Sequence, residues 1–211
     1  MPGAAIVRPC GLVLAGGLAR RMNGRDKALL RLDPATTLLD VLLQRLAPQC
    51  GQVAISANGD PLRFAAASLP VLGDLSGPSR GPLAGVLAGL DYLFSKAPEG
   101  WLLTVPSDTP FVPADLVARL YAAARESGRP VARATCGDRL HSLVALWSGT
   151  LREPLRYALM DRDLRKVTAF QAEAGVVNVP WAGAPHDPFY NVNTPEDLEV
   201  ARAIHRDARA P

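Results

Sequence analysis

The sequence has few residues that could form the crosslinks of a secreted or zinc-stabilised domain. Its 211 residues include three cysteines, Cys10, Cys50 and Cys136, an odd number with wide spacing. No CxxC pair and no histidine cluster accompanies them, so neither a disulfide framework nor a zinc site is expected. We therefore expect a cytoplasmic protein with reduced thiols.

Long hydrophobic runs and blocks of one charge are also missing. Residues 1–9 contain no apolar segment of the secretory kind, and the run 10–15 is too short to span a membrane. The 23 basic and 20 acidic residues give a net charge of +3, with no block of five like charges. This pattern argues against a nucleic-acid-binding tail and against a membrane protein. A small positive excess suits a protein that receives anionic small molecules.

Strands and helices alternate through the first 130 residues, which is typical of an α/β fold. We expect a three-layer sandwich with a mostly parallel, Rossmann-like sheet, in a single domain over residues 1–211. Apolar runs predict strands at 10–15, 52–56, 71–72, 101–105, 131–134, 143–147 and 176–179. Apolar spacing and capping residues predict helices at 37–46, 61–68, 82–95, 113–126, 150–159 and 163–174, and one that starts at Thr194.

The first candidate site is the segment 14–27, which follows the first predicted strand. Adjacent glycines, Gly16 and Gly17, let backbone N–H groups turn toward one anion because no Cβ intervenes. Basic residues that could neutralise a triphosphate then follow within eight positions: Arg20, Arg21, Arg25 and Lys27. The alternative is a solvent-exposed basic turn.

Two better-known phosphate loops do not match this segment. A P-loop requires Ser or Thr after its lysine, whereas Ala28 follows Lys27, and the G-x-G-x-x-G pattern of dinucleotide enzymes is absent. The sequence therefore disfavours a P-loop NTPase and an NAD-dependent enzyme.

The second candidate is Asp108, which stands between Pro106 and Pro110 directly after the predicted strand 101–105. Ligands of open α/β sheets collect at the carboxyl ends of the strands. A carboxylate there could hold Mg²⁺, which commonly takes one or two carboxylates and completes its shell with water and phosphate oxygens. The alternative is that Asp108 caps the helix predicted from Pro113.

Two further segments lie at predicted helix starts. A helix that begins at Pro82 presents free N–H groups to an anion, although Gly81 to Gly85 could be an ordinary loop-to-helix junction. Asn191 and Asn193 precede the helix that Thr194 starts, where Asn193 could simply support the cap.

Together these segments resemble the Mob-type nucleotidyltransferase family. Segment 14–27 is similar to the family signature L-A-G-G-x-[AS]-x-R-M-G-x-D-K, and segments 81–85, 106–110 and 191–195 resemble its guanylyltransferase branch. The matching motifs span roughly residues 10 to 203. The sequence departs from the family pattern at Asn23, where Gly is usual, and at Ser142, where His141 would be followed by Pro.

The resemblance implies a nucleotidyltransferase fold and an enzyme that transfers GMP from GTP to molybdenum-molybdopterin, with Mg²⁺, releasing pyrophosphate. The alternatives are a cytidylyltransferase that uses CTP and a catalytically inactive nucleotide-binding adaptor. The nucleotide-binding part would span about 10–115 and the pterin-substrate part about 130–200. Partners would be GTP and molybdopterin, and further molybdenum cofactor biosynthesis proteins, acceptor molybdoenzymes or their chaperones.

The resemblance also implies roles for individual residues. Asp108 would hold Mg²⁺, and Lys27 and Arg21 would neutralise the triphosphate. Nucleotide-binding positions would be Leu14, Ala15, Gly16, Gly17, Lys27, Asn58, Asp74, Gly81, Pro82, Leu83 and Asp108. Arg165, Lys166, Asn191 and Asn193 would meet the pterin substrate.

Overall fold

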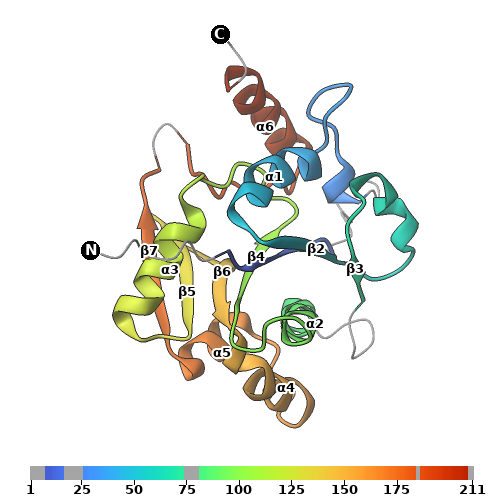
Figure 1. Ribbon diagram of the computed structural model, residues 1–211. Coiled ribbons are helices and arrows are strands. Elements are labelled where there is room, and N and C mark those ends of the chain that lie inside the picture. Colours follow the sequence, from blue (N-terminus) through green and yellow to red (C-terminus); the bar gives the residue numbers. More distant parts are fainter. Residues whose placement is uncertain (1–7, 17–25, 74–80, 184–185, 209–211) are drawn as a thin grey trace.

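A seven-stranded sheet forms the middle of the computed structural model, which describes residues 8–16, 26–73, 81–183 and 186–208 (Figure 1). The strand order is β3-β2-β1-β4-β6-β5-β7, and β6 is the one strand that runs antiparallel to its neighbours. The predicted α/β fold with a mostly parallel sheet is confirmed. The strands are β1 (Cys10–Leu14), β2 (Gln52–Ser56), β3 (Val71–Leu72), β4 (Trp101–Pro106), β5 (Val131–Cys136), β6 (Arg139–Ser148) and β7 (Val176–Trp181).

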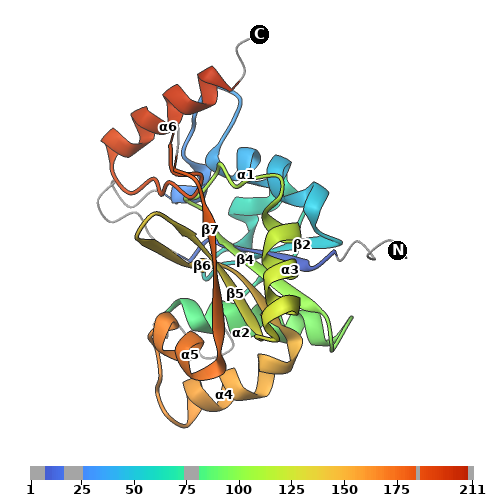
Figure 2. The same cartoon turned by 90° about the vertical axis from the view of Figure 1, so that its left-hand side faces the viewer.

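Helices cover both faces of the sheet and make the three layers (Figures 1 and 2). One apolar core lies between the sheet and helices α1 (Leu38–Leu46) and α3 (Leu116–Ser127). A second core lies on the opposite face, under α2 (Pro82–Phe94), α4 (Arg152–Met160) and α5 (Val167–Ala174). The central strands are buried on both faces, which explains why they are continuous apolar runs in the sequence.

The last helix, α6 (Pro195–Asp207), packs outside α1 through a third apolar cluster that includes Leu38, Val41 and Leu198 (Figure 2). Its start is as predicted: the Thr194 hydroxyl accepts from the Asp197 amide, and the Asp197 carboxylate accepts from the Thr194 amide. This reciprocal capping box fixes where the helix begins. The segment before α6 therefore has a defined position, beside the end of β4, where the Val192 amide donates to the Asp108 carbonyl.

The structure differs from the sequence prediction in several places. Helix α5 begins at Val167, four residues after the predicted start at Asp163. Residues 61–67 form a 3-10 helix, η4 (Pro61–Ala67), instead of an α-helix. Helix α3 begins at Leu116, three residues after the predicted start at Pro113. β5 and β6 are longer than predicted because Gly137 and Asp138 join them as a two-residue hairpin, with Gly137 at a φ of +53°. That hairpin makes β6 antiparallel.

Three shorter 3-10 segments complete the described elements: η2 (Lys27–Leu29), η3 (Ala47–Gln49) and η5 (Gly149–Leu151). All three cysteines are buried and free. Burial raises the pKa of the Cys10 thiol to about 11 and that of the Cys50 thiol to about 12. Within the described residues, none of the helices combines the length and apolar character that crossing a membrane requires.

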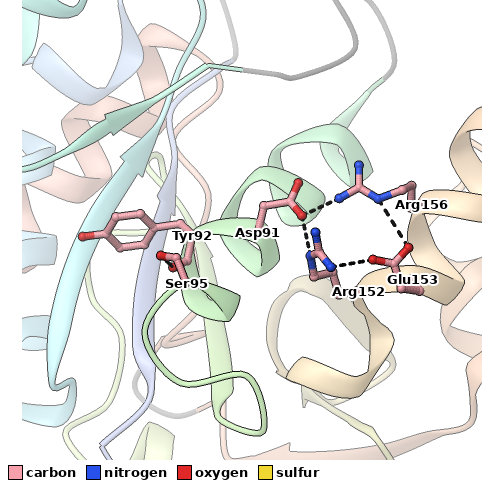
Figure 3. A network of polar contacts seen from close by, with 6 residues as sticks. All are labelled: Asp91, Tyr92, Ser95, Arg152, Glu153 and Arg156. Atoms are coloured by element: carbon pink, nitrogen blue, oxygen red, sulfur yellow. Dashed lines mark hydrogen bonds and ion pairs between the residues drawn. The ribbon is translucent and has the colours of Figure 1, made fainter.

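An ion-pair network joins α2 to α4 on one face of the sheet (Figure 3). Asp91 of α2 accepts at Oδ1 from Arg152 Nε at 2.6 Å and from Arg156 Nη2 at 2.5 Å. Glu153 pairs with the same two arginines from the solvent side, where its side chain is 66% exposed against 18% for Asp91. The half-buried Asp91 therefore fixes α2 against α4.

Replacing Asp91 with Ala is expected to lower the free energy of unfolding by about 2 kcal/mol, because two guanidinium groups lose a shared, partly buried acceptor. Glu153→Ala is the matched control within the network. Its exposed pairs are screened by water, so its effect should stay under about 1 kcal/mol. Urea unfolding of both variants measures the difference, and equal losses would show that burial of Asp91 has no energetic consequence.

Candidate active site

The candidate site lies where the strand order of the sheet reverses. From β1 the chain proceeds to β2 and β3 on one side and then crosses to β4 on the other. Leu14 at the end of β1 is level with Ser56 of β2 and Pro106 of β4. Ligands of open α/β sheets bind outside the carboxyl ends of the strands at such a reversal.

A pocket of about 370 Å³ opens at this edge of the sheet. Seven of the predicted residues line it: Leu14, Gly16, Lys27, Asn58, Gly81, Pro82 and Asp108. Three further lining residues, Gly85, Pro106 and Ser107, belong to the segments 81–85 and 106–110 that the sequence analysis singled out, and it missed Ser56 and Leu143. Two predicted residues, Ala15 and Leu83, are buried in the core and do not line the pocket. Gly17, Arg21 and Asp74, together with Asn23, lie outside the described residues.

Glycines allow helix α2 to approach the pocket closely. A Cβ on Gly85 would lie 2.6 Å from Ser56 Oγ and 3.1 Å from Leu14 Cδ2, so any side chain there would collide with the sheet. Gly81 precedes the helix with a φ of +74°, and Pro82 occupies its first turn. The N-terminus of α2, with its unpaired N–H groups and positive dipole end, therefore borders the pocket.

Two lining residues of the pocket, Lys27 and Asp108, contact each other and two asparagines. Lys27 Nζ donates to Asp108 Oδ2 at 3.0 Å and to Asn193 Oδ1 at 2.6 Å. Asn191 Nδ2 donates to the second oxygen of the same carboxylate, Oδ1, at 3.0 Å. The side chains of Lys27 and Asp108 are 17% and 15% exposed. Lys27 is thus a partly buried, paired cation, and the alternative of a solvent-exposed turn is wrong for this residue.

Backbone hydrogen bonds hold Asp108 at the end of β4. The Asp108 carbonyl accepts from the Val192 amide at 2.9 Å, and the preceding Ser107 amide donates to the Leu14 carbonyl at 3.0 Å. Helix α3 starts later, with Asp115 at its N-cap position. The alternative that Asp108 caps this helix is therefore wrong, and its carboxylate faces Lys27 and Asn191 instead.

Asp26 and Arg63 fix the start of η2, the short helix that begins with Lys27. Asp26 Oδ1 accepts from the Ala28 amide and caps η2, while Oδ2 accepts from Arg63 Nε at 2.8 Å. Arg63 comes from η4, the segment that follows Asn58, so this ion pair links the Lys27 side of the pocket to the Asn58 side. The sequence analysis missed Arg63 because its sequence neighbours do not distinguish it from an ordinary surface arginine.

The four residues assigned to the pterin lie in two places. Asn191 and Asn193 contact Asp108 and Lys27, and the Asn193 amide also donates to Asp197 at 2.9 Å and so supports the cap of α6. Arg165 and Lys166 are exposed and precede α5, and Arg165 pairs with Asp163 at 2.9 Å. The Arg165 carbonyl is 3.8 Å from the position of a Cβ on Gly81. This loop therefore borders the α2 side of the pocket.

His141 of β6 is buried beside a carboxylate. Its Nε2 lies 3.2 Å from Asp187 Oδ2, and its ring centroid is 5.0 Å from that of Phe189. Burial lowers the pKa of His141 more than the nearby Asp187 raises it, so the imidazole is neutral at pH 7. Ser142, where the sequence analysis expected Pro, uses its carbonyl to accept from Gln171 Nε2 at 2.8 Å.

Comparisons with known proteins identify relatives over nearly the whole chain. The model of the MobA-like NTP transferase domain matches residues 11–175. A protein of Rhodopseudomonas palustris (strain HaA2) named molybdenum cofactor guanylyltransferase is 48% identical, over 93% of this chain and 92% of its own. One of the same name from Bradyrhizobium sp. (strain ORS 278) is 49% identical, over 92% of each chain.

Solved structures share the fold at lower sequence identity. Molybdopterin-guanine dinucleotide biosynthesis protein A from Archaeoglobus fulgidus is 22% identical with a TM-score of 0.73, over 94% of this chain and 99% of its own. The 4-diphosphocytidyl-2C-methyl-D-erythritol synthase of Anaerococcus prevotii is 12% identical with a TM-score of 0.65, over 95% of this chain and 97% of its own. The architecture is therefore shared with enzymes whose names refer to different nucleotides.

Proposed function

Because this chain belongs to the MobA-like NTP transferase family, we propose that it transfers GMP from GTP to molybdenum-molybdopterin. One observation carries the choice of substrates: relatives that are 48% and 49% identical over 92% or more of this chain are named molybdenum cofactor guanylyltransferase. The cytidylyl alternative is not favoured by these names. The paired Lys27 and Asp108 at the strand ends argue against an inactive adaptor.

GTP would occupy the larger pocket with its phosphates toward Lys27 and Asp108. Asn58, Gly81 and Pro82 line the part of the wall formed by the end of β2 and the start of α2, where we place the base and ribose. Gly16 offers a backbone with no Cβ for close approach of a phosphate. Arg21, Gly17 and Asp74 remain predicted members of this site.

Asp108 fits the requirements of a Mg²⁺ ligand. Each oxygen of its carboxylate accepts one donor from the described residues and keeps a second lone pair. No group of three or more His, Cys, Asp or Glu side chains suited to a metal occurs in the described ranges. A single carboxylate that shares Mg²⁺ with phosphate and water oxygens matches this arrangement, and the ion would offset the charge of both reactants when bound.

In the proposed reaction, an oxygen of the terminal phosphate of molybdopterin attacks the α-phosphorus of GTP. The bond from that phosphorus to the oxygen bridging it to the β-phosphate breaks, and pyrophosphate leaves with the bonding electrons. A phosphate monoester carries nearly two negative charges at pH 7, so no general base is required. Lys27 stabilises the charge on the phosphates, while Asn191 and Asn193 hold the Asp108 carboxylate and the Lys27 ammonium in place.

Several wider assignments stay proposals. The part of the chain at about 130–200, including Arg165 and Lys166, would contact the pterin. The part at about 10–115 would contact the nucleotide, and both parts would belong to one domain. We place the protein in the cytoplasm, where its donor GTP is available. Other cofactor-biosynthesis proteins and acceptor molybdoenzymes would be its partners.

We expect GTP to be preferred over CTP and ATP by at least about 100-fold in kcat/KM. A site that hydrogen-bonds the guanine edge leaves buried polar groups unpaired when another base enters, so it rejects that base strongly. Pyrophosphate release with Mg²⁺ and molybdopterin measures the three nucleotides side by side. Comparable turnover with CTP would assign the chain to the cytidylyl branch.

A further inference from the structure

A second, smaller pocket lies next to the nucleotide pocket. It has a volume of about 190 Å³ and shares Pro106 and Leu143 with the larger pocket. Asn191 lines it and donates to Asp108, so the second pocket reaches the same carboxylate from another side. Its remaining lining residues are Thr109, Arg139, Leu140, His141, Ser142 and Val144.

Arg139 gives this second pocket a cation with spare hydrogen-bonding capacity. It is the first residue of β6, directly after the hairpin turn, and its side chain is 64% exposed. Its contact with a carboxylate is long, with Nη1 at 3.5 Å from Asp187 Oδ2, and the Asp187 side chain is only 13% exposed. A guanidinium has five N–H donors, so Arg139 can bind a second anion in bidentate fashion.

The surroundings of the second pocket are polar. Thr109 Oγ1 is buried and makes no hydrogen bond to any described residue. His141 Nε2 is also buried and lies 3.2 Å from Asp187 Oδ2. Ser142 is partly exposed and lies between the buried His141 and the shared wall residue Leu143. Buried polar groups disfavour an apolar ligand, because such a ligand would leave them unpaired. Arg139, the one cationic residue among the described residues that line the second pocket, makes a small anionic group the better match.

We propose that this second pocket is the acceptor-phosphate subsite, in which Arg139, Ser142 and Asn191 bind the terminal phosphate of molybdopterin. The inference rests on the proposed function, which requires two anionic reactants to meet beside Asp108. The larger pocket holds the nucleotide, so the acceptor must arrive from a neighbouring space. The second pocket is such a space, and Arg139 supplies the positive charge that a phosphate monoester requires.

The alternative occupant of the second pocket is the triphosphate tail of GTP itself. If molybdopterin phosphate occupies the pocket, substitution of Arg139 weakens the binding of molybdopterin. If the triphosphate of GTP occupies it, the same substitution weakens the binding of GTP. Arg139→Gln removes the charge but keeps an amide, Arg139→Lys restores a point charge, and Ser142→Ala removes one hydroxyl. Arg125→Gln is the matched control, because Arg125 is an exposed arginine in the last turn of α3 and does not line either pocket.

The test measures the KM for molybdopterin at saturating GTP, the Kd for GTP by calorimetric titration, and the melting temperature. Arg139→Gln should raise the molybdopterin KM about tenfold or more and leave the GTP Kd within about twofold. Arg139→Lys should recover part of the loss, Ser142→Ala should raise the KM roughly threefold or more, and Arg125→Gln should match the wild type.

An unchanged molybdopterin KM in Arg139→Gln, or a loss that falls on GTP instead, would overturn the subsite while the proposed function stands. A wild-type protein that forms no dinucleotide from GTP and molybdopterin would overturn the proposed function and the subsite with it. The melting temperature separates both outcomes from a general loss of structure.

Discussion

Asp108→Asn is expected to reduce turnover by about 1,000-fold or more while the fold survives. The substitution keeps the shape of the side chain and removes the negative charge that a hard divalent cation requires. It also places an amide NH₂ against either Lys27 Nζ or Asn191 Nδ2, which are both donors. The ground-state arrangement of the phosphate-binding groups is therefore disturbed as well.

Pyrophosphate release and thermal unfolding measure the two consequences of Asp108→Asn separately. Asp115→Asn is the matched control, because it makes the same chemical change at the N-cap of α3, where the carboxylate is 54% exposed. This control should keep wild-type activity. If Asp108→Asn turned over at a near wild-type rate with ordinary Mg²⁺, the metal assignment would be wrong, and if it unfolded, Asp108 would be a structural residue.

Lys27→Ala is expected to weaken GTP binding by about 100-fold and guanosine binding by less than about threefold. The lysine ammonium is a point charge, and guanosine presents no phosphate to it. Loss of Lys27 also leaves Asp108 without the cation that lies 3.0 Å away, so the carboxylate would repel a triphosphate. Titration with and without Mg²⁺ separates this repulsion from the loss of direct contact.

Lys96→Ala serves as the control for Lys27→Ala, because Lys96 follows the C-terminal end of α2 and its ammonium lies 5.1 Å from the ring centroid of Tyr92. Both nucleoside and nucleotide should bind this control as they bind the wild type. Equal losses of GTP and guanosine affinity in Lys27→Ala would place Lys27 at the base or in the scaffold.

The parts of the fold that the sequence predicted well are those set by local patterns. The buried strand 10–14 is a continuous apolar run, and Thr194 with Asp197 forms a capping box that depends on residues three apart. The 3-10 helix at 61–67 was missed because its apolar spacing resembles that of an α-helix. The reversal of β6 was missed because it depends on how Gly137 and Asp138 close a hairpin, which the short apolar runs on either side do not reveal.

In the candidate site, too, local patterns were predicted from the sequence and long-range contacts were not. Asp108 and Lys27 were found because each follows a strand end or a glycine pair, but their direct contact joins positions 81 residues apart. The contact from Lys27 to Asn193 spans 166 positions. Spacing alone put Asn191 and Asn193 on one side of the chain but could not identify what they face. No sequence pattern indicated a role for Arg139, because that role depends on a pocket lined by three separated segments, 106–109, 139–144 and Asn191.

The central claim is that GMP passes intact from GTP to molybdopterin, and one measurement tests it most directly. The wild-type protein is incubated with Mg²⁺, molybdopterin and GTP that carries a radioactive label on the α-phosphate, and the products are separated. The account predicts that the label appears in molybdopterin guanine dinucleotide and that the released pyrophosphate is unlabelled. Label that remains in GTP, or that appears only as free GMP, would contradict it.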